Sequence, residues 1–425
     1  MTSVRSSRDS GATTDASTPR FYEALGLDGD ITPLGAMMHH AFGGPVEGSI
    51  EWIKTAPAEN RVVRTGEPVR GPIAACLRRM KMGLWVGGKS VPLMGIAGVA
   101  VSPEARGFGH APWMMGEAIK EMWTEGVALS GLYASTQPLY RKVGYEHAGR
   151  LTVVSAPIAS IVPDIPTSLG VVRPIVDADA QSVRACYASM ASRLDGMLDR
   201  GEYVWDRVKN FRGEPHTGFA MLDDAGEIVA YAYVAMRRRA SGGVDVSVSD
   251  AAFIDADAGR RVLTFLAGYG TMGHNVRMVY APGHPLASLM RLSPTLMGRG
   301  PVEIDEAHFV RVVRVREAIE SRGYPLGISA EVHLRVRDEL LPGNAGVWRV
   351  VIEKGVAKAD RLGDVGSAAP ESVIDLDIRG LASVVTGFRP AKELPLVGLG
   401  DGARESLRLA SAVFSGGRGM IVDAY

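Results

Sequence analysis

The sequence predicts a chain of about three domains, each built from mixed α-helices and β-strands, in the α/β and α+β classes. Three observations support this prediction. The length of 425 residues exceeds what one hydrophobic core usually organises, so roughly three domains are expected. Apolar residues make up 46% of the chain, a share typical of folded globular proteins. Short apolar runs alternate with segments of helical period along the chain, which is the pattern of α/β and α+β domains.

The composition excludes several kinds of partner. The formal net charge is +0, so no overall field attracts nucleic acid or an anionic membrane. No apolar run reaches the ~18 residues that a membrane span needs. The two cysteines, Cys76 and Cys186, lie far apart and predict buried thiols in a reducing cytoplasm, and no residues show metal-ligand spacing. Residues 1–20 lack an apolar segment and are predicted to be a disordered tail rather than a secretion signal.

The first folded domain is expected over residues 21–156. It should begin with a short helix, continue with a strand meander that turns at Gly87-Gly88, and then reach a buried strand, a loop and a longer helix. The expected ranges are 34–42 for the first helix, 61–65, 73–80 and 84–86 for the meander, 95–101 for the buried strand and 112–124 for the longer helix.

The loop between that buried strand and helix contains a pattern suited to anions. A strand, a glycine-bearing loop and a helix N-terminus in this order direct free backbone N–H groups and the helix dipole at one point. Gly109 lets the backbone approach a phosphate closely, and Arg106 can add a charge-assisted contact. The six residues alone fit an ordinary loop equally well, so an anion site needs support from other parts of the chain.

A tyrosine on a short helix comes after the next predicted strand at 128–135. Tyr140 lies within the segment 137–142, and Gly144-Tyr145 forms a turn into a further strand. The phenol of Tyr140 is a donor that can protonate a leaving group. The alternative is a packed aromatic residue with a hydrated hydroxyl.

Two further domains are expected. The central one, 157–307, opens on a proline-rich linker and repeats the strand–turn–helix order at 244–269 without the glycine loop. The third, 308–425, has a period-two alternation at 331–338, typical of a half-buried strand, followed by a turn and a return strand at 347–352.

These motifs resemble one known family. The loop at 106–111 has the form R-x-x-G-x-A and resembles the acetyl-CoA pyrophosphate loop of the GCN5-related N-acetyltransferases (GNAT), and segment 137–145 resembles that family's tyrosine helix. Together with four later segments, the order is similar to the Eis (enhanced intracellular survival) family. The later segments are 284–286, 309–315, 338–348 and 375–383. The resemblance implies tandem GNAT folds, the second degenerate, followed by a sterol-carrier-protein-like α+β domain.

The resemblance also implies an activity and its residues. It implies an acetyl-CoA-dependent N-acyltransferase that acts on an amine of a small molecule or a lysine-like side chain. Tyr140 is implied as the general acid, and the α-carboxylate of Tyr425 as the general base; a frayed terminus, or the side chain of Asp423, is the alternative. The implied acetyl-CoA contacts are Val99, Ala100, Val101, Arg106, Gly107, Gly109, His110 and Ala111.

The acceptor pocket and the assembly are implied in the same way. In this family the first helix helps to line the acceptor pocket, although core packing explains the apolar members equally well. The implied pocket residues are Met38, His39, Phe42, Glu51 and Trp52. A homo-hexamer is implied as well. Two other functions stay open: a GNAT scaffold recruited to condensation or cyclisation without CoA, and a non-enzymatic binder of an apolar ligand.

Overall fold

The computed structural model describes residues 18–55, 58–211, 213–240, 242–279, 284–291, 302–417 and 419–425. The chain forms two compact units, which we call unit 1 (residues 1–79 and 98–118) and unit 2 (residues 80–97 and 119–425). Strands β3 (Ile73–Val86) and β4 (Lys89–Val101) and helix α3 (His110–Thr124) each contribute residues to both units. Of the expected disordered tail, residues 1–17 lie outside the described residues, and Arg20 already begins strand β1.

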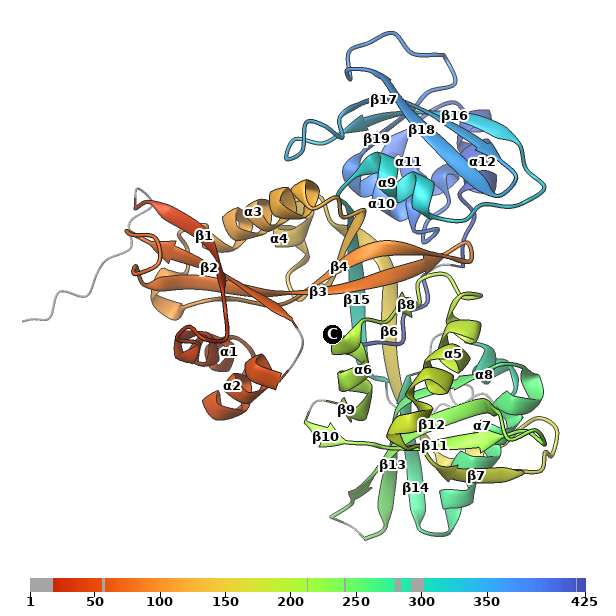
Figure 1. Cartoon of the computed structure of the whole chain (residues 1–425). Helices are drawn as coiled ribbons and strands as arrows, with labels where there is room; N and C mark the ends of the chain where they lie inside the picture. Colours follow the sequence, from red (N-terminus) through yellow and green to blue (C-terminus); the bar gives the residue numbers. More distant parts are fainter. Residues whose placement is uncertain are drawn as a thin grey trace, which may run out of the picture. The chain divides into compact units, whose positions relative to one another are not determined.

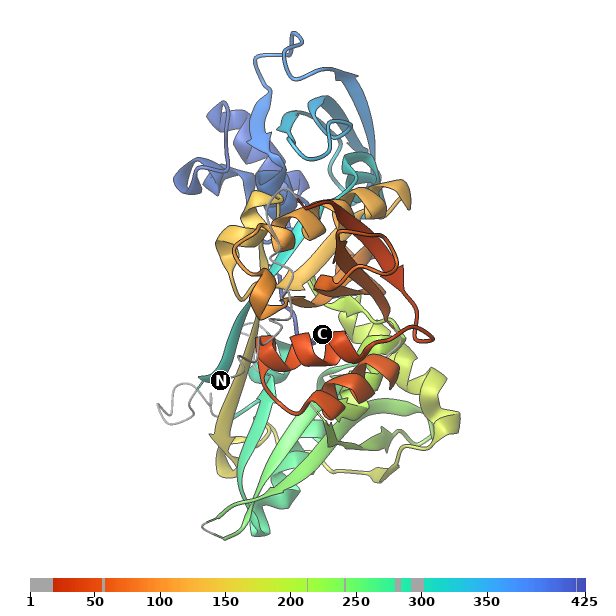
Figure 2. The ribbon, with the colours of Figure 1, turned by 90° about the vertical axis from the view of Figure 1, so that its left-hand side faces the viewer.

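Unit 1 combines an antiparallel sheet with two helices. Strand β1 (Arg20–Leu25) pairs with β2 (Glu59–Thr65), which pairs with β3. Helices α1 (Thr32–Phe42) and α2 (Val46–Thr55), the two red helices of Figure 2, pack on each other. Arg78 is fully buried and donates to the carbonyls of Trp52 and Ile53, so its charge meets the negative end of α2. The short helix η1 (Pro103–Ala105) follows β4.

The large sheet of unit 2 contains two parallel strand pairs. Its order is β4-β5-β15-β6-β14-β13-β12-β11-β7. The pairs β4–β5 and β13–β14 are parallel, as expected for strands joined through a helix. The further strands of this sheet are β5 (Leu129–Tyr133), β6 (Glu146–Pro157), β7 (Val171–Pro174), β11 (Thr217–Leu222), β12 (Ile228–Arg238), β13 (Val244–Phe253), β14 (Gly273–Val279) and β15 (Val302–Val312).

Strand β15 shows where sequence and structure differ. The sequence led us to expect a strand at 309–315 as the entry to the third domain, but β15 inserts between β5 and β6 and pairs antiparallel with both. An apolar run predicts a buried strand without saying which sheet it joins. Short pairings add β8 (Leu198–Asp199) to β3, and β9 (Asn210–Phe211) to β10 (Glu214–Pro215).

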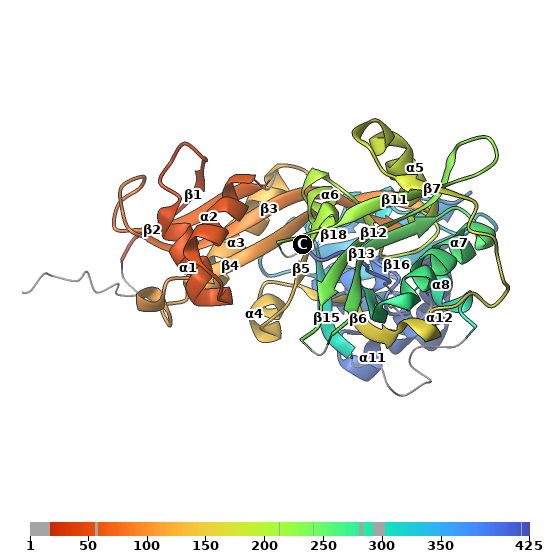
Figure 3. The ribbon, with the colours of Figure 1, turned by 90° about the horizontal axis from the view of Figure 1, so that it is seen from below.

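Helices cover the β11–β13 part of this sheet. Helices α5 (Ala180–Ala191) and α7 (Ala256–Ala267) both pack against β12 and β13 (Figure 3). Cys76 in unit 1 and Cys186 on α5 are buried free thiols, which confirms the sequence prediction. The remaining helices of this part are α4 (Gln137–Lys142), η2 (Ile158–Ser160), η3 (Asp177–Asp179), α6 (Glu202–Lys209), η4 (Gly268–Thr271) and α8 (Pro285–Ser288).

A separate five-stranded sheet forms the C-terminal part of unit 2 (Figure 1). The predicted alternation is present, because buried and more exposed residues alternate along β16 (Ala330–Arg337). Arg322 is fully buried and donates to carbonyls at the C-terminal ends of α10 and α12, including Val385 and Ser415. The other elements are α9 (Val315–Ser321), β17 (Gly346–Glu353), β18 (Val356–Gly363), β19 (Ile374–Asp377), α10 (Ile378–Val385), η5 (Ala391–Glu393), α11 (Leu394–Val397), β20 (Gly400–Asp401) and α12 (Arg404–Val413).

Candidate active site

The glycine loop between β4 and α3 is open on its outer side. Gly107 has φ +87° and Gly109 has φ +75°, a left-handed conformation that favours glycine. A Cβ placed on either residue would meet nothing within 4 Å. Among the described residues, the N–H groups of Gly107, Phe108 and Gly109 donate to no other backbone group. The loop therefore presents unpaired donors to open space.

The start of α3 adds favourable electrostatics. No acidic residue lies in the first turn of α3. Arg106 is exposed, and its guanidinium also reaches the carbonyl of His40 at 3.3 Å. His110, the first helical residue, is 4% exposed, and neither ring nitrogen has a hydrogen-bond partner within the described parts of the chain. Burial, together with the nearby Arg20, lowers the pKa of His110, so the ring is neutral at pH 7.

These features fit a phosphate group. Unpaired N–H donors, a helix N-terminus without acidic neighbours and an exposed guanidinium all favour an anion. The other implied contacts lie next to this loop. Val99 and Val101 are half-buried and Ala100 is buried at the end of β4, and Ala111 is half-buried at the start of α3.

The implied acceptor residues of unit 1 divide into two groups. Met38 is buried and Trp52 is half-buried, and both pack in the core beside Gly98, where a Cβ would lie 2.6 Å from Met38 Cε. His39, Phe42 and Glu51 are exposed on α1 and α2, with Phe42 62% exposed. The His39 ring bonds to the carbonyl of Gly44.

Tyr140 lies on α4, as the sequence predicts, and is 5% exposed. Burial raises its pKa to about 12, so the phenol stays protonated at neutral pH. Its ring meets that of Tyr145 edge-on at 6.2 Å. The Tyr145 hydroxyl is bonded to Ser130, whose own proton goes to the carbonyl of Met94 on β4. Tyr140 makes no such bond to any residue that the structure describes, so its hydroxyl remains available to a ligand.

The ring of Tyr425 occupies a slot between two glycines. Gly95 of β4 and Gly131 of β5 are directly paired. A Cβ on Gly131 would lie 2.7 Å from the Tyr425 hydroxyl, and one on Gly95 would lie 3.0 Å from its ring. Any larger residue at Gly131 would therefore displace the Tyr425 ring. The ring fits against the two strands because neither Gly95 nor Gly131 has a side chain.

His308 and Tyr133 complete this slot. His308 Nε2 and the Tyr425 hydroxyl share a hydrogen bond of 2.6 Å, and the Tyr133 ring lies 5.3 Å from that of Tyr425. Burial lowers the pKa of His308 to about 3, with a smaller contribution from His147. The imidazole is therefore neutral at physiological pH, and its bond to Tyr425 does not depend on titration in that range.

The Asp423 side chain faces a different environment. It is 4% exposed, and its Oδ1 lies 2.6 Å from Arg200 Nη2. Arg200 also holds Asp250 through two hydrogen bonds of 2.6 and 2.8 Å. Burial raises the pKa of Asp423, and Arg200 opposes that shift. Because this carboxylate is already bound to a buried guanidinium, it is poorly placed to take a proton from a substrate.

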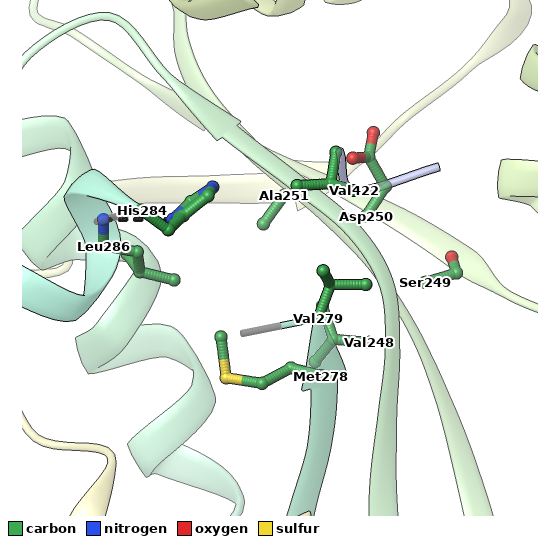
Figure 4. Close-up of a pocket in the computed structure, with 9 residues that line it drawn as sticks. All are labelled: Val248, Ser249, Asp250, Ala251, Met278, Val279, His284, Leu286 and Val422. Carbon is green, nitrogen blue, oxygen red and sulfur yellow. Dashed lines mark hydrogen bonds between the residues drawn. The ribbon is translucent and has the colours of Figure 1, made fainter. Parts of the chain in front are cut away.

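The corresponding region of the central domain is closed. Asp255 caps α7, and its Oδ1 accepts from the N–H of Ala258 at 2.9 Å. Between β13 and β14 lies a small cavity of about 30 Å³ (Figure 4). Its lining includes His284, Leu286 and, from near the C-terminus, Val422. Burial lowers the pKa of His284 to about 4, against the opposing effect of Asp250. About one water molecule fits such a volume.

Sequence reasoning missed most of the residues around Tyr425. His308, Tyr133, Arg200 and the pair Gly95 and Gly131 come from four distant segments. Each stands in an apolar run or next to a turn, where a single sequence offers no spacing signal. The apolar segment 419–422 and the aromatic last residue, Tyr425, are the signals in the sequence that favour a packed end of the chain.

Comparison with known proteins matches three stretches of the chain to known domain families. Residues 28–148 and 196–314 each match the acetyltransferase (GNAT) domain family, and residues 315–421 match the sterol carrier protein domain family. The N-acetyltransferase Eis of Mycobacterium tuberculosis (strain CDC 1551 / Oshkosh) is 27% identical over 305 residues, 68% of this chain and 73% of that protein.

Solved structures agree. A GCN5-related N-acetyltransferase from Anabaena variabilis ATCC 29413 has a TM-score of 0.86 at 27% identity, covering 96% of this chain and 100% of that one. Eis1 from Mycobacterium abscessus, at 20% identity and a TM-score of 0.72 over 93% of this chain and 97% of its own, shares the fold.

Two acetyltransferase domains and acetyltransferase relatives define the class: the chain is an N-acetyltransferase of the GNAT type. Within that class, the order of two GNAT domains and a C-terminal sterol carrier domain, together with the Eis relatives, makes the chain similar to the Eis proteins. The predicted resemblance, fold class and enzyme class are thereby confirmed. In the described part of the chain, no helix has the length and apolar character to cross a membrane.

Proposed function

We propose that this enzyme transfers an acetyl group from acetyl-CoA to the amine of a small molecule or of a lysine-like side chain. The observation that carries the proposal is the loop at Gly107 and Gly109. Its N–H groups are unpaired and lie directly before helix α3, which has no acidic residue in its first turn. This arrangement suits the pyrophosphate of CoA. The relatives named as N-acetyltransferases support the same chemistry and favour it over CoA-independent chemistry or apolar-ligand binding.

The base in this proposal is the α-carboxylate of Tyr425. It removes a proton from the acceptor amine, directly or through water, and the amine attacks the thioester carbonyl. Support comes from the docked Tyr425 ring and from Arg200, which already engages the competing carboxylate of Asp423. A backbone N–H from the Val99–Val101 part of β4 polarises the carbonyl as negative charge develops there.

The acid is Tyr140. Its phenol is protonated at neutral pH and is bonded to no described residue, so it can donate to the sulfur as the thiolate leaves. With a pKa of about 12 the phenol is a weaker acid than an ordinary thiol, so its contribution begins as a hydrogen bond to the developing charge.

We also propose a closed homo-oligomer, a hexamer by family resemblance, which sedimentation can test.

The test is acetyl-CoA-dependent acetylation of a panel of amines, measured by release of the free thiol. Tyr140→Phe keeps the ring and removes the proton, so kcat should fall by roughly 10²–10⁴-fold with little change in stability. Tyr269→Phe, a half-buried tyrosine on η4, is the control and should retain activity. A Tyr140→Phe rate within about threefold of wild type contradicts the acid role.

A second variant tests the base. A glycine added after Tyr425 keeps the ring and moves the carboxylate by up to ~3.5 Å, which is beyond hydrogen-bond reach of its first position. The extended protein should bind CoA normally and lose turnover. Full activity of the extended protein would show that another group takes the proton.

A further inference from the structure

We propose that Arg200 is a positioning residue: through Asp423 it holds the final residues of the chain, and so fixes where Tyr425 lies. The anchoring stands on the buried contacts of Asp423 and its neighbours, and its effect on turnover rests on the proposed function of Tyr425.

Arg200 links the C-terminal tail, residues 419–425, to the central domain at a buried point. Its side chain is 1% exposed, and the carboxylates of Asp250 and Asp423 are each 3% exposed. Asp250 belongs to β13, and Arg200 directly follows β8, so one guanidinium joins two parts of the fold to the tail. Tyr187 stacks beneath the guanidinium at 3.6 Å, and its hydroxyl lies 3.2 Å from Asp423 Oδ2. The bidentate geometry and the ring leave the guanidinium little freedom to move.

The charge of this cluster points to a positional role. Asp250 alone neutralises Arg200, so Asp423 adds a second buried carboxylate that the cluster does not require. An excess buried charge is unfavourable for stability, and such groups can be retained because they specify one arrangement. Asp423 is the member of this cluster that belongs to the C-terminal tail. Its ion pair with Arg200 therefore specifies the position of that tail.

The backbone on both sides of Asp423 is held as well. Arg207 of α6 donates to the carbonyl of Ala424 at 3.1 Å, close to the C-terminus marked in Figure 1. On the other side, Met420 donates to the carbonyl of Asp195 at 2.9 Å. Gly419 is packed so closely that a Cβ would lie 2.0 Å from the carbonyl of Ala148. These contacts guide the chain, but Asp423 supplies its one buried ion pair among the described tail residues 419–425.

The geometry transmits this hold to Tyr425. Only Ala424 lies between Asp423 and Tyr425, so the two residues are at most about 7 Å apart along an extended chain. The hydroxyl of Tyr133 donates to the carbonyl of Asp423, and His308 bonds to the ring of Tyr425. Loss of the Asp423 ion pair therefore allows residues 423–425 to leave the glycine slot without disturbing the strands that form it.

The experiment measures tail release and catalysis separately. Carboxypeptidase A removes accessible C-terminal aromatic residues, so the rate of tyrosine release from the native 425-residue protein reports how often the tail leaves its site. Asp423→Asn keeps the shape and removes the charge. Release should rise about 10–100-fold, since a hydrogen bond to a charged group is lost, and kcat should fall while the acetyl-CoA KM is unchanged.

Asp250→Asn is the matched control. It removes the other carboxylate from the same guanidinium but leaves the Arg200–Asp423 pair, so tyrosine release should stay near the wild-type rate. If Asp423→Asn does not fold, Arg200→Lys supplies the same test, because an ammonium cannot hold both carboxylates in a bidentate manner.

The outcomes separate the two proposals. Faster release with lower kcat supports both. Faster release with unchanged kcat supports the anchor and contradicts the base role of Tyr425. Unchanged release in Asp423→Asn and Arg200→Lys overturns the anchor, and so does equally fast release in Asp250→Asn, which would indicate general loosening of the cluster.

Discussion

In two parallel strand pairs of this protein, one strand continues beyond the residues that are paired. The helix start that follows is open in the first pair and capped in the second. The register of β4 with β5 covers Leu93–Gly95, and β4 then continues to Val101. The register of β13 with β14 ends at Ser247, and β13 continues to Phe253. After each strand comes a turn and a helix. The first turn, with Gly107 and Gly109, presents its donors to open space; in the second, Asp255 satisfies the helix start itself.

A helix N-terminus can receive an anion only where the chain leaves its N–H groups unpaired and accessible. Asp255 and Asp257 give the start of α7 a negative charge where a phosphate would have to bind. The space beside β13 is also taken, by His284, Leu286 and Val422. The C-terminal segment 419–425 contributes to both places. Val422 lines the cavity between β13 and β14, and the ring of Tyr425 lies against the glycines of β4 and β5.

The largest effect should come from closing the open helix start. Gly109→Glu places a bulky anion at a left-handed position beside the loop N–H groups, so CoA affinity measured by calorimetry should fall by at least about 100-fold. Gly226→Glu is the control, because Gly226 also has a left-handed φ, of +83°, with nothing within 4 Å. Unchanged CoA affinity in a folded Gly109→Glu protein would mean that this loop is not the site.

The two strand pairs also share a feature that can be tested with pH. A buried histidine accompanies each pair: His308 bonds to Tyr425 at the first, and His284 lines the cavity at the second. His308 and His284 are buried with pKa values of about 3 and 4, below the ordinary 6.5, so protons bind preferentially to the unfolded chain. Stability is therefore lost as pH falls below 6.5. Each histidine should account for about 2 kcal/mol of the free energy of unfolding lost between about pH 7 and pH 5.

Urea denaturation at the two pH values checks this expectation. His308→Gln and His284→Gln should each flatten the dependence on pH, whereas the exposed His274→Gln should not. If His308→Gln shows the same loss as wild type, the ring is not held neutral in the folded protein.

The glycine slot should respond more modestly. Gly131→Ala directs a Cβ at the Tyr425 hydroxyl, and the displaced ring should lower kcat about tenfold without changing CoA affinity. Gly268→Ala adds the same methyl group where nothing lies within 4 Å and should be silent. Normal kcat in Gly131→Ala would show that the ring position does not matter for turnover.

The smallest effect tests the closed helix start. Asp255→Ala removes the cap of α7 and should cost about 1 kcal/mol of stability. It should not create a second CoA site, because Asp257, His284 and Val422 remain. Calorimetry should therefore still give one CoA per chain. Binding of two would show that Asp255 alone closes the central domain.

The fold could be predicted largely because its signals are local. Strand β4, the break after it and helix α3 follow from an apolar run, Pro103 and a helical period, and α4 was correctly placed around Tyr140. Gly87 and Gly88 form the expected turn with φ values of +61° and +79°. Strand β15 could not be placed, because its partners are chosen by packing rather than by its own sequence.

The surroundings of the site could be predicted only in part. The loop glycines can be recognised in the sequence, since their backbone conformation requires them. His308, Arg200 and Asp250 acquire their roles from contacts between segments far apart in the sequence, and it is burial in the fold that lowers the pKa of His308. A single sequence carries no signal for that proximity.

The long-range closure of the tail also has a kinetic consequence. Tyr133 and Asp423 are 290 residues apart in sequence, and Tyr187 and Asp423 are 236 apart. Contacts of such separation form late, because the chain between them must be ordered before they can stabilise anything. A refolding molecule should therefore regain its helices and sheets first and seat Tyr425 afterwards. Recovery of native circular dichroism would then precede recovery of activity.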